Sequence, residues 1–375
     1  MVRPGISVLL QERPELVAGQ RIGIFTNQTG VLPDLASTVD ALISVADVRA
    51  IFSPEHGLYG AAAAGAEVAA DVHHSGVPIW SLYGAHLAPT PVQLNRLDAI
   101  VCDIQDIGCR FYTYAWTLVK LMAAAAQANI TVIIADRPNP LGGMIEGPSL
   151  DREQRSLVGG HDVPIRHGLT LGELAQLVQR ELELRCTLVV VPCAGWRRDL
   201  GWTATGLPWV PPSPNIPTPE SALVYPGTCL LEGANVSVGR GTAKPFEWLG
   251  APWIDGVALA AALNAHLLSG VLWRPLRFQP CAAPYAGETC GGVQLHVVDA
   301  AVFRPVAAGL ALVTTMYRLY ADQWSWDRAH FDRLIGSAHV RAQIELGRSL
   351  AELSASWVQD EAEFAKRCAA VRLYA

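Results

Sequence analysis

The sequence of 375 residues has a formal net charge of −6 and is 51% hydrophobic and 17% charged. This composition is typical of a packed globular protein, excludes a disordered chain and, at this length, predicts two domains. Acidic and basic residues are scattered along the chain, so no basic stripe indicates a nucleic-acid-binding surface.

Targeting signals and cysteine spacing give a first expectation of compartment. The first twenty residues contain no long apolar run, and no later stretch is an uninterrupted membrane span. The eight cysteines occur singly, without the CxxC pairs or Cys/His spacing of a zinc site. Free buried thiols are the expected state of Cys102, Cys186 and Cys193. We therefore predict a cytoplasmic protein, with an exported mature form as the alternative.

Strands and helices alternate through the first half of the chain. Short apolar runs predict buried strands at 21–25, 48–52, 98–102, 130–135 and 188–191. Helices are predicted over 37–45 and 115–128, and a third begins after Thr170, which has Glu173 at the capping-box position. This alternation predicts a parallel, right-handed, Rossmann-like α/β sheet.

Polar and charged side chains gather directly after these strands, where each strand ends. Because ligands bind outside the carboxyl ends of strands in open α/β sheets, four such exits predict a pocket along one rim. The polar residues after any single strand have an alternative interpretation as residues that stabilise a turn. Glu55 alone has an alternative interpretation as the cap of a helix. The exit residues are Asn27, Glu55, His56, Asp103, Asp106, Asp136, Arg137 and Asn139.

The second half of the chain changes character. Residues 209–252 form a long segment crowded with Pro and Gly, which is typical of a functional loop. From about residue 253, a helix over 257–268, strands at 276–278 and 293–298, and further helices predict a smaller α+β, barrel-like domain. We predict domains at 1–250 and 251–375, with the active site in the cleft between them.

The motifs for several common chemistries are missing. The sequence has no GxSxG elbow, no GxxxxGK[ST] loop and no HExxH pair, and Gly239-Arg240-Gly241 lacks the context of a dinucleotide fingerprint. We therefore predict neither a cofactor nor a catalytic metal. Carboxylates mixed with Asn, Arg, His and aromatic residues suit a sugar ligand. The residues alone predict a hydrolase or a binding module for a polar or anionic small ligand.

Nine motifs, spread in order over nearly the whole chain, resemble the exo-β-N-acetylmuramidase family of glycoside hydrolases, long known only as a domain of unknown function. The motifs are FTNQTGV (25–31), FSPEHGLYG (52–60), DIQDIGCRFYTY (103–114), DRPNPLGG (136–143), EGP (146–148), RHGLTLGEL (166–174), PSPNIPT (212–218), YPG (225–227) and GRGTAKPFE (239–247).

The resemblance implies an activity and a catalytic residue. It implies release of N-acetylmuramic acid from the non-reducing end of peptidoglycan fragments, by a Rossmann-like domain paired with a smaller carboxyl-terminal domain. The Glu of the family's SPEHG motif is the catalytic carboxylate and corresponds to Glu55. The partners implied are saccharides that contain N-acetylmuramic acid, rather than nucleic acid or a membrane.

Roles for individual residues follow from the motifs and the resemblance together. Glu55 is the expected general acid. His56 is expected to tune it or to bind substrate, with a structural hydrogen bond as the alternative. Asp103, Asp106 and Asp136 are candidates for a second catalytic carboxylate or for binding sugar hydroxyls. A retaining, an inverting and a substrate-assisted mechanism all stay open. The expected substrate-binding residues are Asn27, Arg110, Tyr112, Asp136, Arg137, Asn139, Arg166, His167, Asn215, Glu232, Asn235 and Arg240.

The cation that would hold the lactyl carboxylate of muramic acid is expected among Arg110, Arg137, Arg166 and Arg240. Each of these arginines, taken alone, has an alternative interpretation as a structural ion pair.

Two positions depart from the family pattern, since Val238 replaces an acid and Ala234 a hydroxyl residue, which leaves fine specificity open. A non-catalytic muropeptide-binding protein is the main alternative function, followed by a metal-dependent amidase or phosphoesterase.

Overall fold

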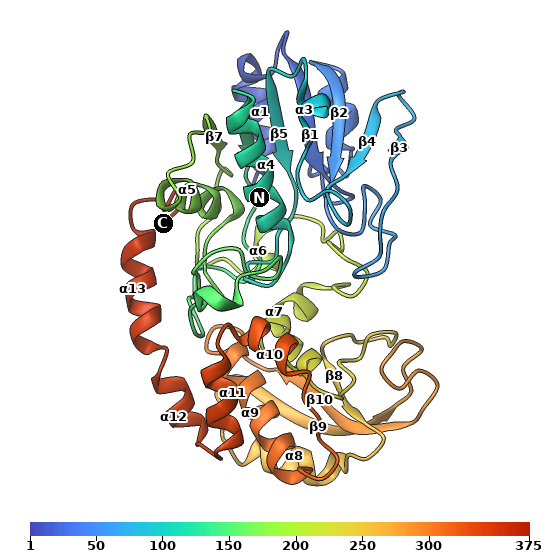
Figure 1. Ribbon diagram of the computed structural model, residues 1–375, viewed down its shortest axis with the longest axis vertical. Helices are drawn as coiled ribbons and strands as arrows, with labels where there is room; N and C mark the ends of the chain where they lie inside the picture. The colour runs from blue at the N-terminus through green and yellow to red at the C-terminus, as the bar shows by residue number, and fades with distance from the viewer.

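The computed structural model describes residues 1–375 and has a larger and a smaller lobe stacked along its long axis (Figure 1). The larger lobe is built on a seven-stranded sheet in the order β3-β4-β2-β1-β5-β6-β7, parallel except for β3. Its strands are β1 (Arg21–Thr26), β2 (Asp47–Ser53), β3 (Asp71–Val72), β4 (Pro78–Ser81), β5 (Ala99–Asp103), β6 (Thr131–Ala135) and β7 (Leu188–Val191).

This strand order confirms the predicted Rossmann-like sheet. The chain builds outward from β1 to β2 and β4 on one side, then from β5 to β6 and β7 on the other. The order therefore reverses between β1 and β5, the kind of position at which α/β proteins commonly bind ligands. Side chains alternate across the sheet, so that Ile22 and Ile24 face one apolar cluster while Ile100 and Cys102 face the other.

Helices cover both faces of this sheet. Residues of α1 (Gly5–Glu12) and α2 (Thr38–Ile43) belong to the smaller apolar cluster, whereas α4 (Tyr114–Gln127) and α5 (Leu171–Glu181) belong to the larger one. Thr170 and Glu173 form the predicted capping box of α5. Two short helices, α3 (Pro91–Leu94) and α6 (Trp202–Thr205), lie in connections.

The smaller lobe contains a three-stranded antiparallel sheet in the order β8-β10-β9. The predicted barrel-like form is wrong, because three strands in this order make an open sheet. The strands are β8 (Trp248–Ala251), β9 (Val271–Phe278) and β10 (Cys290–Val297). The helices are α7 (Pro219–Thr228), α8 (Gly256–Asn264), α9 (Pro305–Leu319), α10 (Arg328–Ile335), α11 (Ala338–Glu345), α12 (Leu350–Ala355) and α13 (Val358–Cys368).

The two lobes share one continuous core. The larger apolar cluster runs from Phe52 in the seven-stranded sheet to Phe331 and Trp357 in the smaller lobe. Helices α7 and α9 meet at glycines, since a Cβ added to Gly227 would lie 1.8 Å from the Pro305 carbonyl oxygen. The predicted domain boundary at residue 250 stays a prediction. It falls within β8, which pairs with β10 of the smaller lobe.

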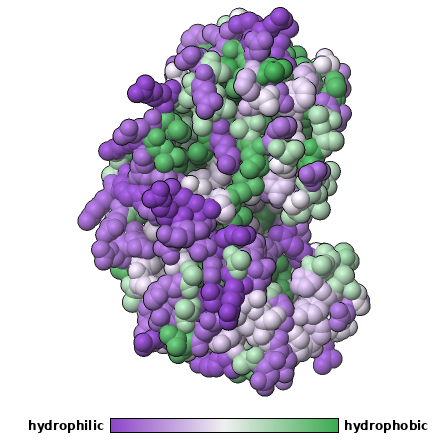
Figure 2. All heavy atoms as spheres, viewed as in Figure 1, coloured by the Kyte–Doolittle hydropathy of each residue, from purple (hydrophilic) through white to green (hydrophobic).

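The molecule narrows between the lobes, and α13 runs along one side, where hydrophilic side chains dominate the surface (Figures 1 and 2). No helix combines the length and the apolar character needed to span a membrane.

Candidate functional site

Glu55 lies in a tight turn immediately after β2, where His56 and Gly57 both adopt left-handed backbone angles (φ 71° and 77°). Its side chain is half-buried and held at both oxygens. The Thr113 hydroxyl donates to Oε2 at 2.8 Å, and the Gly65 N–H donates to Oε1 at 2.9 Å. A carboxylate fixed in this way has a defined direction, which acid–base chemistry on a bound substrate requires.

His56 is anchored by the same neighbouring segment. Its Nδ1 lies 2.7 Å from the Ala62 carbonyl oxygen, which can only accept, so Nδ1 carries a proton. No protein group bonds to Nε2, and His56 lines the same cavity as Glu55. The hydrogen bond to Ala62 agrees with the structural role considered for His56, and the free Nε2 leaves a role towards substrate open.

This cavity has a volume of about 260 Å³ and is lined by both lobes. The large lobe contributes Glu55, His56, Tyr83, Tyr112 and Thr113, and the chain from Ser213 onward contributes further polar groups. Six of the predicted site residues are brought together here: Glu55, His56, Tyr112, Asn215, Glu232 and Arg240.

Phenol groups surround the Glu55 carboxylate. Burial, followed by the charge of Glu55, raises the pKa of Tyr83 to about 12, so its hydroxyl keeps its proton and can donate. Burial also raises the pKa of Tyr112, whose hydroxyl has no hydrogen-bond partner. Unpartnered buried polar groups of this kind are costly, and a bound ligand can satisfy them.

Arg240 and Glu232 form the charged wall of the cavity. Arg240 Nε lies 2.6 Å from Glu232 Oε1, and its guanidinium stands 5.1 Å from the centre of the Phe246 ring. The two Nη nitrogens of Arg240 bond to no protein acceptor. Arg240 therefore offers a positioned donor pair to an anionic group in the cavity.

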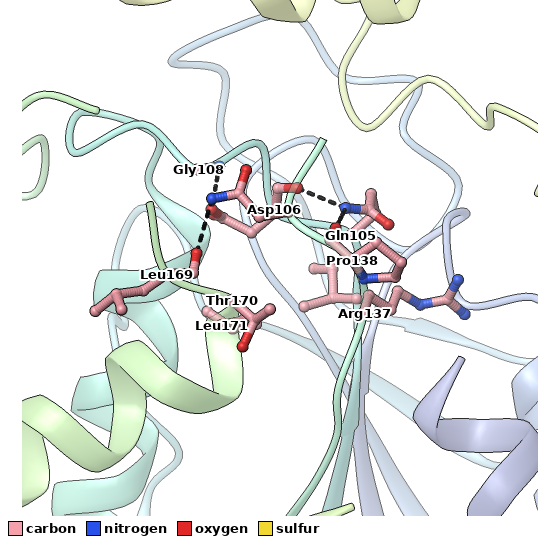
Figure 3. Close-up of a pocket in the computed structure, with 10 residues that line it drawn as sticks. Gln105, Asp106, Gly108, Arg137, Pro138, Leu169, Thr170 and Leu171 are labelled. Carbon is pink, nitrogen blue, oxygen red and sulfur yellow. Dashed lines mark hydrogen bonds between the residues drawn. The ribbon is translucent and has the colours of Figure 1, made fainter. Parts of the chain in front are cut away.

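Two predicted catalytic carboxylates lie elsewhere, buried under the rim. Asp103 pairs with Arg137 through both oxygens, at 2.6 and 2.8 Å, and also accepts from the Thr38 hydroxyl. Asp106 accepts from the Gly108 N–H at 2.7 Å and lines a separate hollow of about 10 Å³ (Figure 3). A hollow of this size holds about one water molecule, not a sugar.

Three more rim residues are engaged within the protein. Asn27 Oδ1 accepts from both the N–H and the hydroxyl of Thr29. Asn139 bridges the Leu169 carbonyl and the Leu141 N–H, and Asp136 accepts from Gly172 and Tyr374. These side chains hold the strand exits in shape and do not reach the cavity.

The other predicted arginines are structural in their contacts. Arg110 is buried and donates to three carbonyls, those of Pro148, Val163 and Leu334. Arg166 donates to the Leu141 carbonyl and lines a larger hollow of about 720 Å³ outside the Glu55 cavity. That hollow gathers few free charges, because Arg198 pairs with Glu173 and Asp199 with Arg197.

Two further predicted residues also lie outside the cavity. His167 is buried, and burial lowers its pKa to about 3, so the ring is neutral and accepts from the Leu169 N–H. Asn235 bonds to the backbone of Gln323 and Ser325.

The sequence prediction missed several residues of the cavity. Tyr83 follows the short strand β4, so the strand-exit rule that found Glu55 also applies to it. Thr113 lies inside the DIQDIGCRFYTY motif, where its residue type alone predicts no role in the site. Tyr225 comes from α7, and His330 comes from α10 in the smaller lobe, where no local pattern marks it.

The family models described as Exo-beta-N-acetylmuramidase NamZ, N-terminal and C-terminal, match residues 22–220 and 223–374. The chain belongs to the NamZ family. It is 43% identical over 370 residues to the peptidoglycan beta-N-acetylmuramidase NamZ of Bacillus subtilis (strain 168), covering 97% of this chain and 89% of that protein.

Two solved structures share the NamZ-family fold. Both are DUF1343 family proteins from Bacteroides fragilis NCTC 9343. Their TM-scores are 0.92 and 0.81 at 35% and 32% identity, and each match covers 100% of this chain and 99% of the other.

The NamZ family models meet between residues 220 and 223, and the cavity takes residues from both sides of that point. Neither departure from the family pattern lines it. Val238 is buried in the main core, and the backbone of Ala234 bridges to Trp326.

Proposed function

We propose that this chain is an exo-acting glycoside hydrolase that releases N-acetylmuramic acid from the non-reducing end of peptidoglycan fragments, with Glu55 as the general acid. The observation that carries the proposal is the Glu55 carboxylate, held at both oxygens inside a cavity closed by two lobes. Membership of the NamZ family and 43% identity to a peptidoglycan beta-N-acetylmuramidase support it.

The surroundings of Glu55 suit proton transfer. A general acid gives its proton to the leaving glycosidic oxygen and is left as a carboxylate. The Thr113 hydroxyl can donate or accept, so its hydrogen bond to Oε2 survives in both protonation states of Glu55. The Gly65 N–H stays directed at Oε1 and stabilises the carboxylate that forms.

The walls of the cavity suit a muramyl sugar. Tyr112, Tyr225 and Phe246 form a series of edge-to-face ring contacts with centroid distances of 6.1 and 4.7 Å. These rings present apolar surface to a pyranose, while Asn215 and His330 add polar groups to the lining. Arg240 binds the lactyl carboxylate that distinguishes muramic acid from glucosamine.

The test is turnover of an aryl β-N-acetylmuramide by the wild type and by Glu55→Gln. The amide keeps an acceptor for Gly65 and a partner for Thr113, so the fold and KM stay close to those of the wild type. We expect kcat to fall by roughly 10²- to 10⁴-fold, the usual contribution of a general acid.

A folded wild type without turnover, combined with unchanged sugar affinity in Glu55→Gln, would instead indicate a binding protein. The matched glucosaminide serves as the specificity control. A cytoplasmic location stays a prediction.

A further inference from the structure

Three side chains with metal-binding groups meet at the edge of the large sheet, outside the Glu55 cavity. Asp40 comes from α2, and His73 and His74 come directly after β3. Their ligand atoms all lie within 4.8 Å of one another, and His74 Nε2 is 3.3 Å from Asp40 Oδ1. The two imidazole centroids are 4.0 Å apart.

The ring of His73 is held in place beside Asp40 and His74. The residue is only 6% exposed, and its Nδ1 lies 2.9 Å from the Ser75 hydroxyl. The Ser75 N–H also donates to this Nδ1 at 3.4 Å, so two contacts with Ser75 fix the orientation of the ring beside Asp40 and His74.

The two histidines are also held on a closed turn. The His73 N–H donates to the Val77 carbonyl at 2.8 Å, and the Gly76 N–H donates to the His73 carbonyl at 2.8 Å. Gly76 has a φ of 88°, which this turn requires and which a residue with a side chain rarely adopts. The ligands therefore stand on two well-defined elements, far apart in sequence.

We propose that Asp40, His73 and His74 bind one Zn²⁺ ion, with water in the fourth position. Two imidazoles and a carboxylate are a ligand set that zinc and its first-row neighbours favour. The side chains of His74 and Asp40 are 72% and 51% exposed, so the ion can enter from solvent and keep a bound water.

The ion would join α2 to the turn between β3 and β4. The chain that leads into this turn carries Ala62 and Gly65, whose backbone groups hold His56 and Glu55. Zinc would thus fix the far end of that segment. The proposal itself rests on the three side chains and is independent of the glycosidase activity.

The experiment adds ZnCl₂ to chelator-treated protein without an affinity tag, and follows stoichiometry by calorimetry and the thermal midpoint. CoCl₂ reports ligand geometry through its visible absorption. We expect the wild type to bind one ion per chain and to gain thermal stability. His74→Ala, which removes a direct ligand, should weaken binding by at least the roughly 10- to 100-fold that loss of an outer-shell partner costs. Asp40→Asn should weaken it as well.

The matched control is His339→Ala, which removes another exposed histidine, located at α11 in the smaller lobe. It should bind zinc as the wild type does. The proposal is overturned if the wild type shows no saturable binding, or if one-to-one binding persists unchanged in both His74→Ala and Asp40→Asn.

Discussion

Two carboxylates that the sequence marks in the same way have different environments in the fold. Glu55 keeps both oxygens paired and faces the cavity, with room for a substrate. Asp106 is buried beside a hollow of about 10 Å³, with Oδ1 lacking any partner. Burial raises the pKa of Asp106 to about 7, so it is substantially protonated at neutral pH.

Asp106→Asn should change the pH dependence of stability. The folded-state pKa of about 7 lies above the ordinary value of 3.8. Stability is therefore lost as pH rises from about 4 through 7, because the unfolded chain releases this proton more readily. Asn keeps an acceptor for Gly108 without the charge. We expect the variant to be more stable than the wild type at pH 8 by roughly 1–3 kcal/mol, and the difference to shrink towards pH 4.

Urea unfolding at several pH values measures this difference. Asp322→Asn, at an exposed position, is the control and should follow the wild type at every pH. A difference between Asp106→Asn and the wild type that does not vary with pH would contradict the assignment.

At the scale of the elements, the sequence predicts where the strands end. It does not predict which of the polar residues after each strand form ion pairs or hydrogen bonds within the protein. Alternating apolar runs located β1, β2, β5 and β6, and the parallel sheet then placed Asn27, Glu55, Asp103 and Asp136 along one rim. Which of these groups stays free depends on contacts distant in sequence. Asp103 is neutralised by Arg137, which follows the neighbouring strand β6.

The segment expected to be a long loop contains α7 and β8. Pro226 and Gly227 lie within α7. Because both residues normally interrupt helices, helix propensity does not predict a helix here. Packing of α7 on α9 at the Gly227 contact stabilises it instead. His330 reaches the cavity through this same tertiary packing, which no local pattern encodes.

The segment after α13 fastens the end of this helix to the large sheet. Tyr374 donates to Asp136 Oδ2 at 2.6 Å and accepts from the Cys193 N–H at 2.9 Å. Arg367, near the end of α13, pairs with Glu181 of α5. A helix that begins in the smaller lobe therefore ends against the larger one (Figure 1).

Tyr374→Phe should destabilise the protein by about 1–3 kcal/mol, the cost of leaving buried polar groups unpaired. The change removes the partner of both Asp136 and Cys193 while keeping the ring against Trp196. Denaturant unfolding measures the loss, and Tyr59→Phe at an exposed position is the control. Equal stability of the two variants would show that the hydroxyl contributes nothing.

Across the whole molecule, the cavity exists only because the lobes are held together. Arg110 donates from the large lobe to the Leu334 carbonyl of α10, and Leu334 itself lines the cavity. Glu55 lies within the stretch that matches the amino-terminal family model, whereas Arg240 lies within the carboxyl-terminal one. Glu55 and Arg240 therefore line one cavity from opposite sides of the boundary between the two models.

Arg240→Ala tests whether Arg240 binds the lactyl carboxylate of the substrate. If Arg240 binds the lactyl carboxylate, the variant should bind free N-acetylmuramic acid about 10- to 100-fold more weakly, the usual cost of losing a charged hydrogen bond. Binding of N-acetylglucosamine, which lacks that carboxylate, should change little.

Because Arg240→Ala leaves Glu232 unpaired, the double variant Arg240→Ala/Glu232→Gln separates loss of the cation from repulsion by a bare carboxylate. Calorimetric dissociation constants of both sugars give the result, and an unchanged ratio between them in both variants would exclude Arg240 as the specificity determinant.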